Sequence, residues 1–178
     1  RGVLDDDTYD DGSQGPWLLF DFAEGDNNAP APSLQDIMAK DRLDHKEHHQ
    51  HHLHFLQQAL GAVSTESDLP DNPLATTIDV LLEQLLQVLQ HVHDHNIVHR
   101  DVKPANLLLS DGHVILIDFG SAADVDTAGI LKENLGWGDR VSISPVYAAP
   151  EVFCDPNRSA VNFDTFSVGL IACQLLFQ

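Results

Sequence analysis

The stretch HNIVHRDVKPANLLLSDGHVILIDFGSA, residues 95–122, most constrains the fold of this chain. Short apolar runs alternate in it with polar segments, which predicts brief strands around a polar loop rather than one long helix. The triplet SDG, residues 110–112, is typical of a hairpin turn between two such strands. The second strand, HVILI, would end at Asp118.

Amphipathic patterns predict helices on both sides of this stretch. Apolar residues recur at three- and four-residue steps from Thr77 to near Asn96, which indicates a helix facing a core. FDTFSVGLIACQLLF, residues 163–177, predicts a mostly apolar, buried helix. Ser33 is a candidate N-cap for a further helix over residues 34–43.

The other segments are expected to be less regular. PWLLFDF, residues 16–22, predicts a short strand after the charged loop LDDDTYDDGSQG at 4–15. A polar linker with Pro70 and Pro73 precedes the helix at 77. Residues 121–146 have no sustained period and are expected to form a long surface loop.

Composition excludes several classes of function. The chain has 178 residues with 43% hydrophobic content, enough for one domain or part of a larger one. A formal charge of −19 argues against a nucleic-acid binder or an anionic-membrane binder, since both need a basic face. No apolar run is long enough to cross a bilayer. The two cysteines form no disulfide framework or metal-ligand pattern, which favours a reducing, intracellular compartment.

The polar residues of the opening stretch carry a family resemblance. His99-Arg100-Asp101, then Lys103 and Asn106, then Asp118-Phe119-Gly120 beyond a hairpin resemble the catalytic loop and metal-binding motif of eukaryotic protein kinases. The resemblance implies an α+β, protein-kinase-like fold: mainly the helical C-lobe, with a short remnant of the N-lobe sheet. Residues 1–24 would be that remnant and hinge, and 25–178 the C-lobe, with a His-rich insertion at about 44–76.

Phosphoryl transfer explains why these residue types occur together. The reaction needs positioning and cations placed against developing negative charge more than it needs covalent chemistry. The resemblance assigns Asp101 and Lys103 as catalytic residues: Asp101 orients the substrate hydroxyl and accepts its proton, and Lys103 neutralises the transferred phosphate. Asn106 and Asp118 offer the hard oxygen ligands that Mg²⁺ prefers.

Further matches extend the resemblance along the chain. YAAPE, residues 147–151, is similar to the end of the kinase activation segment. Ser144 matches the hydroxyl residue that contacts the catalytic Asp and Lys in Ser/Thr kinases, and Asp164 matches the residue that supports the catalytic loop. WLLFDFAEG is similar to the fifth strand and hinge, which implies an ATP site formed by Phe20, Asp21, Ala23 and Leu108.

Parts of the family pattern are not found. A Gly-rich loop, a strand Lys and its Glu partner belong before the hinge, and Lys40 and Lys46 lie after it. Glu151 also lacks the Arg that pairs with it in later helices of the family. The chain is therefore expected to be cut at both ends and to lack half of the ATP clamp.

The resemblance implies a serine/threonine kinase acting on a protein substrate. Lys103 followed by Pro104 differs from the Arg-Ala arrangement of tyrosine kinases. SPVYAAPEVF and NFDTFSVGLIACQLLF are similar to plant and algal thylakoid kinases that phosphorylate light-harvesting proteins, so a plastid location is a hypothesis. A pseudokinase or scaffold is the alternative, although Asp101 and Asp118 are both present. A lipid or small-molecule kinase fits less well, because those tend to lack the Ala-Pro-Glu element.

Two other patterns suggest metal binding and regulation. His45, His48, His49 and His52 would share a helical face and could bind Zn²⁺ or Ni²⁺, but a solvated low-complexity insertion is favoured. Arg100 could pair with a phosphate in the activation segment, where the other hydroxyls are Ser121, Thr127 and Ser142. Acidic residues of the segment could supply that charge without modification.

Overall fold

The fold is α+β, with helices joined to small antiparallel sheets. A computed structural model describes residues 2–4, 17–19, 23, 29–48, 54–61, 73–124, 144–154 and 160–177. Its helices are α1 Leu34–His48, α2 His54–Ala59, α3 Pro73–Asp94, α5 Glu151–Cys154 and α6 Asn162–Leu176, with short 3-10 helices η3 Pro104–Asn106 and η4 Phe119–Ser121. The strands described pair as β1 Gly2–Leu4 with β2 Trp17–Leu19, β3 Ile97–Val98 with β6 Ala123–Asp124, and β4 Leu107–Ser110 with β5 His113–Leu116.

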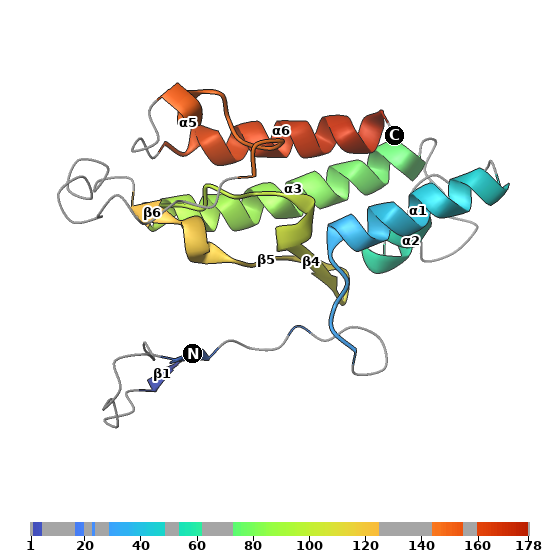
Figure 1. Ribbon diagram of the computed structural model, residues 1–178. Helices are drawn as coiled ribbons and strands as arrows, with labels where there is room; N and C mark the ends of the chain where they lie inside the picture. Colours follow the sequence, from blue (N-terminus) through green and yellow to red (C-terminus); the bar gives the residue numbers. More distant parts are fainter. Residues whose placement is uncertain are drawn as a thin grey trace.

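Helix α3 is the centre of the packed part of the molecule. Figure 1 shows α6 along one side of it, the β4–β5 hairpin along the other, and α1 with α2 at one end. The predicted helix is confirmed, but it begins at Pro73, one turn before Thr77. Proline suits the first turn of a helix, where its missing N–H would have had no partner. The core cluster includes Leu81, Leu85 and Leu89, which form one row along α3.

The predicted hairpin is confirmed and is tied to α3. Asp111 and Gly112 form its turn, with φ of 51° and 78°, the left-handed backbone that a two-residue turn requires. Gln84 holds this turn: its Nε2 donates to the Gly112 carbonyl at 2.9 Å, and its Oε1 accepts from the Val114 N–H at 2.8 Å. The hairpin register pairs Leu108 with Ile115.

Part of the expected His-rich insertion packs into the core. Helix α2 lies within it, and Leu56 on this helix is fully buried. The carboxylate of Asp41 on α1 accepts hydrogen bonds from the Phe55 N–H at 2.8 Å and the Leu56 N–H at 3.3 Å. It thereby caps the first turn of α2, whose N–H groups have no partner within the helix. The expectation of a solvated segment is wrong for α2.

Two short strands, β1 and β6, differ from the predictions. Strand β1 was not predicted; it forms through pairing with β2, and in Figure 1 this ribbon lies apart from the helices. Strand β6 lies within residues 121–146, which were predicted to form a loop. It forms because its backbone pairs with that of β3.

The Ser33 cap is confirmed: its Oγ accepts from the Asp36 N–H at 3.2 Å, and the Asp36 carboxylate accepts from the Ser33 N–H at 3.2 Å.

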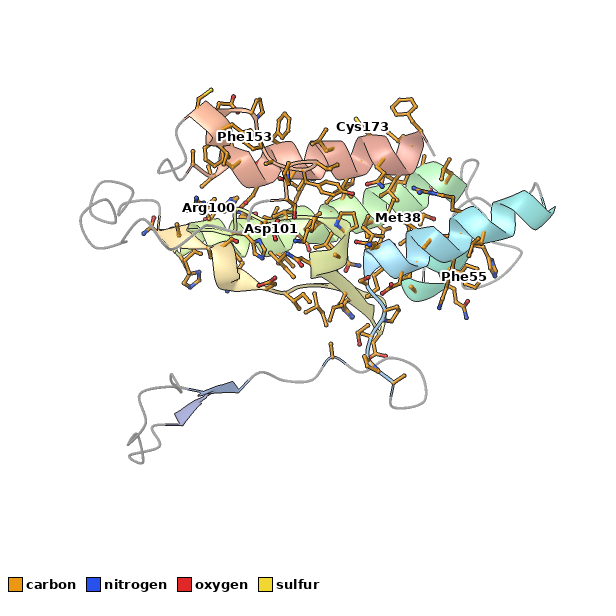
Figure 2. All side chains as sticks on the ribbon, viewed as in Figure 1. Met38, Phe55, Arg100, Asp101, Phe153 and Cys173 are labelled. Atoms are coloured by element: carbon orange, nitrogen blue, oxygen red, sulfur yellow. The ribbon has the colours of Figure 1, made fainter. Side chains whose placement is uncertain are left out.

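Helix α6 is buried on one face only. Ile171 and Leu175 pack against α3, whereas Phe166 and Leu176 are 40% and 51% exposed. The sequence is apolar all round this helix, so its pattern predicted full burial and could not distinguish the faces. Figure 2 places Cys173 on α6 and Phe153 on α5, both on the outer side of the helical layer. No helix in the part of the chain that the structure describes is long and apolar enough to span a membrane.

Replacing Gln84 by Leu should weaken the link between the hairpin and α3. Leucine keeps the side-chain volume but leaves the Gly112 carbonyl and the Val114 N–H without their partner. Each such loss typically costs about 1–3 kcal/mol. Because two groups lose their partner, we expect Gln84→Leu to lower the free energy of unfolding in urea by about 2–6 kcal/mol. The control Gln87→Leu, on the exposed side of α3, should change it little, and equal effects would contradict the assigned link.

Candidate active site

The loop between β3 and η3 carries the candidate catalytic residues. It begins at His99, which is fully buried, and continues through Arg100 with a φ of 69°. Left-handed backbone is uncommon outside glycine and costs about 1–2 kcal/mol. Asp101 follows and is only 5% exposed. Figure 2 shows Arg100 and Asp101 as neighbours within the packed part of the molecule.

Asp164 of α6 holds the strained part of this loop. Its Oδ1 accepts from the Arg100 N–H at 2.8 Å, and its Oδ2 accepts from the His99 N–H at 2.9 Å. The Asp164 side chain is fully buried, so these bonds also replace the water it loses. The prediction that Asp164 supports the catalytic loop is confirmed.

His99 connects the catalytic loop to the strand that leads to Asp118. Its Nδ1 lies 3.3 Å from the Asp101 N–H and can only accept there, and its Nε2 lies 3.0 Å from the Ile117 carbonyl. These partners assign the neutral form with the proton on Nε2. The ring also contacts the edge of Phe119, with 4.8 Å between ring centroids. His99 is therefore buried between the loop that carries Asp101 and the strand that leads to Asp118, and it contacts both.

Asp101, Lys103 and Ser144 form a closed group. The Lys103 Nζ donates to Asp101 Oδ2 at 2.6 Å and to Ser144 Oγ at 2.9 Å. The Ser144 N–H donates to Asp101 Oδ1 at 3.2 Å. The predicted contact of Ser144 with both Asp101 and Lys103 is confirmed. The group combines a carboxylate, a cation and a hydroxyl in one place, which is suited to orienting an incoming hydroxyl and stabilising negative charge.

Asn106 and Asp118 are the candidate metal ligands. The Asn106 Nδ2 donates to the Asp101 carbonyl at 2.9 Å and to Asp101 Oδ2 at 3.2 Å, which leaves its amide oxygen for another partner. The Ile117 N–H donates to the Asn106 carbonyl at 3.0 Å and so brings the strand before Asp118 to the loop. Asp118 is exposed, has a φ of 64° and accepts from the Gly120 N–H.

These two residues suit a magnesium ion better than a transition metal. Mg²⁺ binds through one or two protein oxygens and completes its shell with waters and phosphates. Within the described residues there is no group of three or more His, Cys, Asp and Glu side chains that could hold a metal. An exposed carboxylate and an oriented amide oxygen therefore match the donor set that Mg²⁺ uses.

The predicted adenine site is described only in part. Phe20 and Asp21 lie outside the described residues. The Ala23 carbonyl accepts from the Ala31 N–H at 3.0 Å, so these two residues lie side by side. Leu108 is half-buried in β4 and forms a bridge with Ser33 at the start of α1. Of the predicted adenine site, the structure therefore describes only Ala23 and Leu108.

The residues of the regulatory and metal-binding predictions are described only in part. Ser121 lies in η4 and is only 8% exposed, which makes it a poor target for a modifying enzyme. Burial lowers the pKa of the Arg100 guanidinium, and the carboxylate of Asp164 opposes that shift. The remaining candidates lie outside the described residues or have side chains that are not described: Thr127, Ser142, His45, His48, His49 and His52.

Sequence reasoning missed His93, which touches the same buried carboxylate. Its Nε2 lies 2.8 Å from Asp164 Oδ2. The signal was present in the helical pattern, since His93 continues the buried row Leu85, Leu89 at four-residue spacing. A histidine on an apolar row indicates a buried polar partner.

Comparison with known proteins identifies the family. The protein kinase domain matches residues 38–178, so this chain belongs to the protein kinase family. The serine/threonine-protein kinase mph1 of Schizosaccharomyces pombe is 39% identical over 108 residues, which cover 53% of this chain and 15% of mph1. The serine/threonine-protein kinase chk-1 of Caenorhabditis briggsae is 38% identical over 109 residues, covering 60% of this chain and 21% of chk-1.

A third relative is also named as a serine/threonine kinase. The serine/threonine-protein kinase ULK3 of Xenopus laevis is 37% identical over 103 residues, covering 56% of this chain and 20% of ULK3. This chain therefore matches only 15% to 21% of the length of the three relatives. Membership of the protein kinase family, predicted from the sequence, is confirmed, and all three relatives are named as serine/threonine kinases.

Removing the buried carboxylate should destabilise the whole chain. Asp164→Ala leaves the His99 and Arg100 N–H groups and His93 Nε2 without their acceptor. Breaking such a buried cluster typically costs roughly 3 kcal/mol or more. We expect chemical denaturation to show this loss. Asp79→Ala, at an exposed position on α3, is the control, and its free energy of unfolding should stay close to that of the wild type. If Asp164→Ala changes the free energy of unfolding as little as the control does, the role given to the Asp164 carboxylate is wrong.

Proposed function

We propose that this chain carries the catalytic machinery of a serine/threonine protein kinase, which transfers the γ-phosphate of ATP to a Ser or Thr hydroxyl of a protein substrate. The observation that carries the proposal is the closed group of Asp101, Lys103 and Ser144. A substrate hydroxyl that reaches this group meets an acceptor for its proton and a cation for the phosphoryl charge.

Asp101 would orient the substrate hydroxyl and accept its proton. Its Oδ1 faces the Ser144 N–H and its Oδ2 faces Lys103 and Asn106, so neither oxygen is free to rotate. Fixed geometry of this kind lowers the entropy that a reacting pair must lose. Burial of the side chain also keeps competing water away from the carboxylate.

Lys103 and a metal ion held by Asn106 and Asp118 would neutralise the negative charge of the phosphates. The Lys103 ammonium lies on the same oxygen of Asp101 that Asn106 contacts, so its charge is held at the point of transfer. Asn106 and Asp118 would hold Mg²⁺, which supplies charge neutralisation of bound phosphates. Asp118 suits this role because its side chain is exposed at the end of the hairpin strand.

The class of residue that is phosphorylated is inferred from Ser144 and from Lys103. Ser144 occupies the position at which Ser/Thr kinases place a hydroxyl, and its contact with Lys103 supports that assignment. The sequence Lys103-Pro104 supports it as well. We therefore assign serine and threonine, rather than tyrosine, as the phosphorylated residues. The protein substrate itself would be selected elsewhere on the kinase.

The nucleotide side and the domain layout rest on the resemblance. We assign Phe20, Asp21 and Ala23 to the hinge that binds adenine, and Leu108 to the floor beneath the ring. The half-buried position of Leu108 beside the start of α1 supports this assignment. Residues 1–24 would then belong to the N-lobe and hinge, and residues 25–178 to the C-lobe, with the insertion at about 44–76.

Two narrower assignments concern the kinase group and the site of action. The thylakoid kinase group was proposed from SPVYAAPEVF and NFDTFSVGLIACQLLF, and none of the three relatives above is named as a member of it. We keep an intracellular site of action as the broader proposal. A pseudokinase or scaffold remains the alternative function, and measured turnover decides between the two.

Asp101→Asn should reduce turnover without loss of nucleotide binding. Asparagine keeps the size and most of the hydrogen bonding but cannot accept a proton. Orienting and general-base roles are typically worth on the order of 10² to 10⁴ in rate. In an active kinase that contains residues 1–178, kcat should fall by that order while ATP affinity, measured by calorimetry, stays nearly unchanged.

The matched control for this variant is Asp111→Asn in the hairpin turn. Asp111 is exposed and has a φ of 51°, which asparagine tolerates. Its kcat should equal that of the wild type. Loss of ATP affinity together with rate in Asp101→Asn would assign Asp101 a structural role, and unchanged turnover would reject the proposed function.

Asp118→Asn should weaken the use of Mg²⁺. Asparagine tolerates the left-handed backbone at this position, so the local fold should survive while the charged ligand is lost. We expect turnover in the same active kinase to become undetectable at limiting Mg²⁺, with Asp79→Asn on α3 as a control of equal charge change. Wild-type rates for Asp118→Asn at limiting Mg²⁺ would show that the metal ligands are assigned wrongly.

A further inference from the structure

Two exposed histidines lie side by side where α3 ends. His91 is in the last turn of the helix, and His95 comes directly after its final residue, Asp94. The centroids of the two rings are 4.6 Å apart, and the ring planes are tilted by 54°. Both residues are exposed. The pair therefore presents two imidazole rings to the solvent at one point of the surface.

A backbone hydrogen bond holds the ring of His95. Its Nδ1 lies 2.7 Å from the His91 carbonyl. This carbonyl lacks its usual helical partner, because the His95 N–H donates to the Val92 carbonyl at 3.1 Å instead. A carbonyl only accepts hydrogen bonds, so Nδ1 of His95 carries the proton. In the neutral ring, Nε2 on the opposite side then has a free lone pair.

This arrangement is the one that orients a histidine as a metal ligand. A bond from one ring nitrogen to a backbone carbonyl fixes the ring and leaves the other nitrogen to bind the ion. Among the described residues, the ring nitrogens of His91 have no hydrogen-bond partner. One of them can therefore bind the same ion as Nε2 of His95.

The separation of the rings is compatible with one shared ion. With metal–nitrogen bonds of about 2.0–2.1 Å, two imidazoles at neighbouring positions of one ion have centroids about 4.5–5.2 Å apart. The 4.6 Å between His91 and His95 lies within this range. Four-residue spacing at the end of a helix brings two side chains to the same face, which explains why the rings meet.

The charge around the pair favours a cation. The C-terminal end of a helix carries a partial negative charge. Asp94 lies between the two histidines in the sequence and is exposed, and the whole chain has a formal charge of −19. Imidazole nitrogens bind Zn²⁺, Cu²⁺ and Ni²⁺, whereas Mg²⁺ prefers oxygen ligands. The ion that suits this pair is therefore a transition metal.

We propose that His91 and His95 form a binding site for one transition-metal ion such as Zn²⁺, with water completing its coordination shell. No group of three or more His, Cys, Asp and Glu side chains that could hold a metal exists in the part of the chain that the structure describes. Structural zinc sites use four protein ligands, so a site with two is open and exchanges its ion. The site is separate from Asn106 and Asp118 and does not depend on the proposed function.

The test follows the histidine ring nitrogens by NMR while Zn²⁺ is added to a folded protein that contains residues 1–178. His113 is the internal control, since it is also exposed and its Nδ1 lies 2.8 Å from a backbone carbonyl, that of Asp111. Before Zn²⁺ is added, Nδ1 of His95 should carry the proton. The ring signals of His91 and His95 should then shift together, at a Zn²⁺ concentration about 10-fold or more below that needed for His113, because two linked ligands bind one ion more tightly than a single ligand.

Three variants test whether the two rings share the ion. His91→Gln and His95→Gln each remove one imidazole at an exposed position, and glutamine at 95 keeps a side-chain N–H for the His91 carbonyl. Each should raise the Zn²⁺ concentration needed at the remaining histidine about 10-fold or more, because the second ligand is lost. His113→Gln should leave Zn²⁺ binding at the pair unchanged.

Independent behaviour of the two rings would overturn the proposal. It fails if His91→Gln leaves the Zn²⁺ response of His95 unchanged, or if the pair responds only at the concentration that shifts His113. It also fails if Nδ1 of His95 carries no proton in the metal-free protein. Because each ring is observed separately, binding within the His-rich insertion is distinguished from binding at the pair, and shifts confined to that insertion also count against the proposal.

Discussion

The Asp164 carboxylate is buried at the start of α6 and accepts hydrogen bonds from two consecutive backbone N–H groups of the catalytic loop. The loop needs this support because Arg100 has left-handed backbone, at a cost of about 1–2 kcal/mol. A hydrogen bond to a charged group contributes about 1.5–3 kcal/mol, so two of them outweigh the strain. Without the carboxylate, the loop would relax and Asp101 would lose its place.

The position of Asp164 depends in turn on the packing of α6 against α3. Apolar side chains from both helices fill the space between them, among them Leu85, Leu89, Ile171 and Leu175. Burying a side chain of this size contributes about 1.5–3 kcal/mol, which makes the helix pair a stiff support for the polar groups at its end. The polar groups set the geometry of the site, and the apolar contacts supply the stability that keeps them buried.

The sequence predicted the parts of the fold that depend on local patterns. The helical period identified α3, and the SDG triplet identified the hairpin turn. The resemblance of the loop to the protein kinase motif predicted that Asp101, Lys103 and Asn106 lie together, because their fixed offsets place them on one loop. These features are encoded within a few residues of each other and need no knowledge of the tertiary structure.

The parts that the sequence did not predict depend on contacts between distant segments. The carboxylate of Asp41 caps α2 from another helix. The residues near α2 in the sequence therefore did not predict that a helix forms there. Strands β1 and β6 are too short to show an alternating pattern in the sequence. They form by pairing with β2 and β3. His93 was missed for a similar reason, since its partner Asp164 lies 71 residues away.

Helix α6 also holds the segment that carries Ser144. Ser167 Oγ donates to the Tyr147 carbonyl at 2.7 Å, and the Tyr147 hydroxyl donates to Gln174 Oε1 at 2.6 Å. Asp164, Ser167 and Gln174 recur at helical spacing, so they share one face of an otherwise apolar helix. The same face therefore holds the loop that carries Asp101 and the segment that carries Ser144. Because one helix contacts both, the distance between Asp101 and Ser144 is set by α6 and not by the long segment that connects them in the sequence.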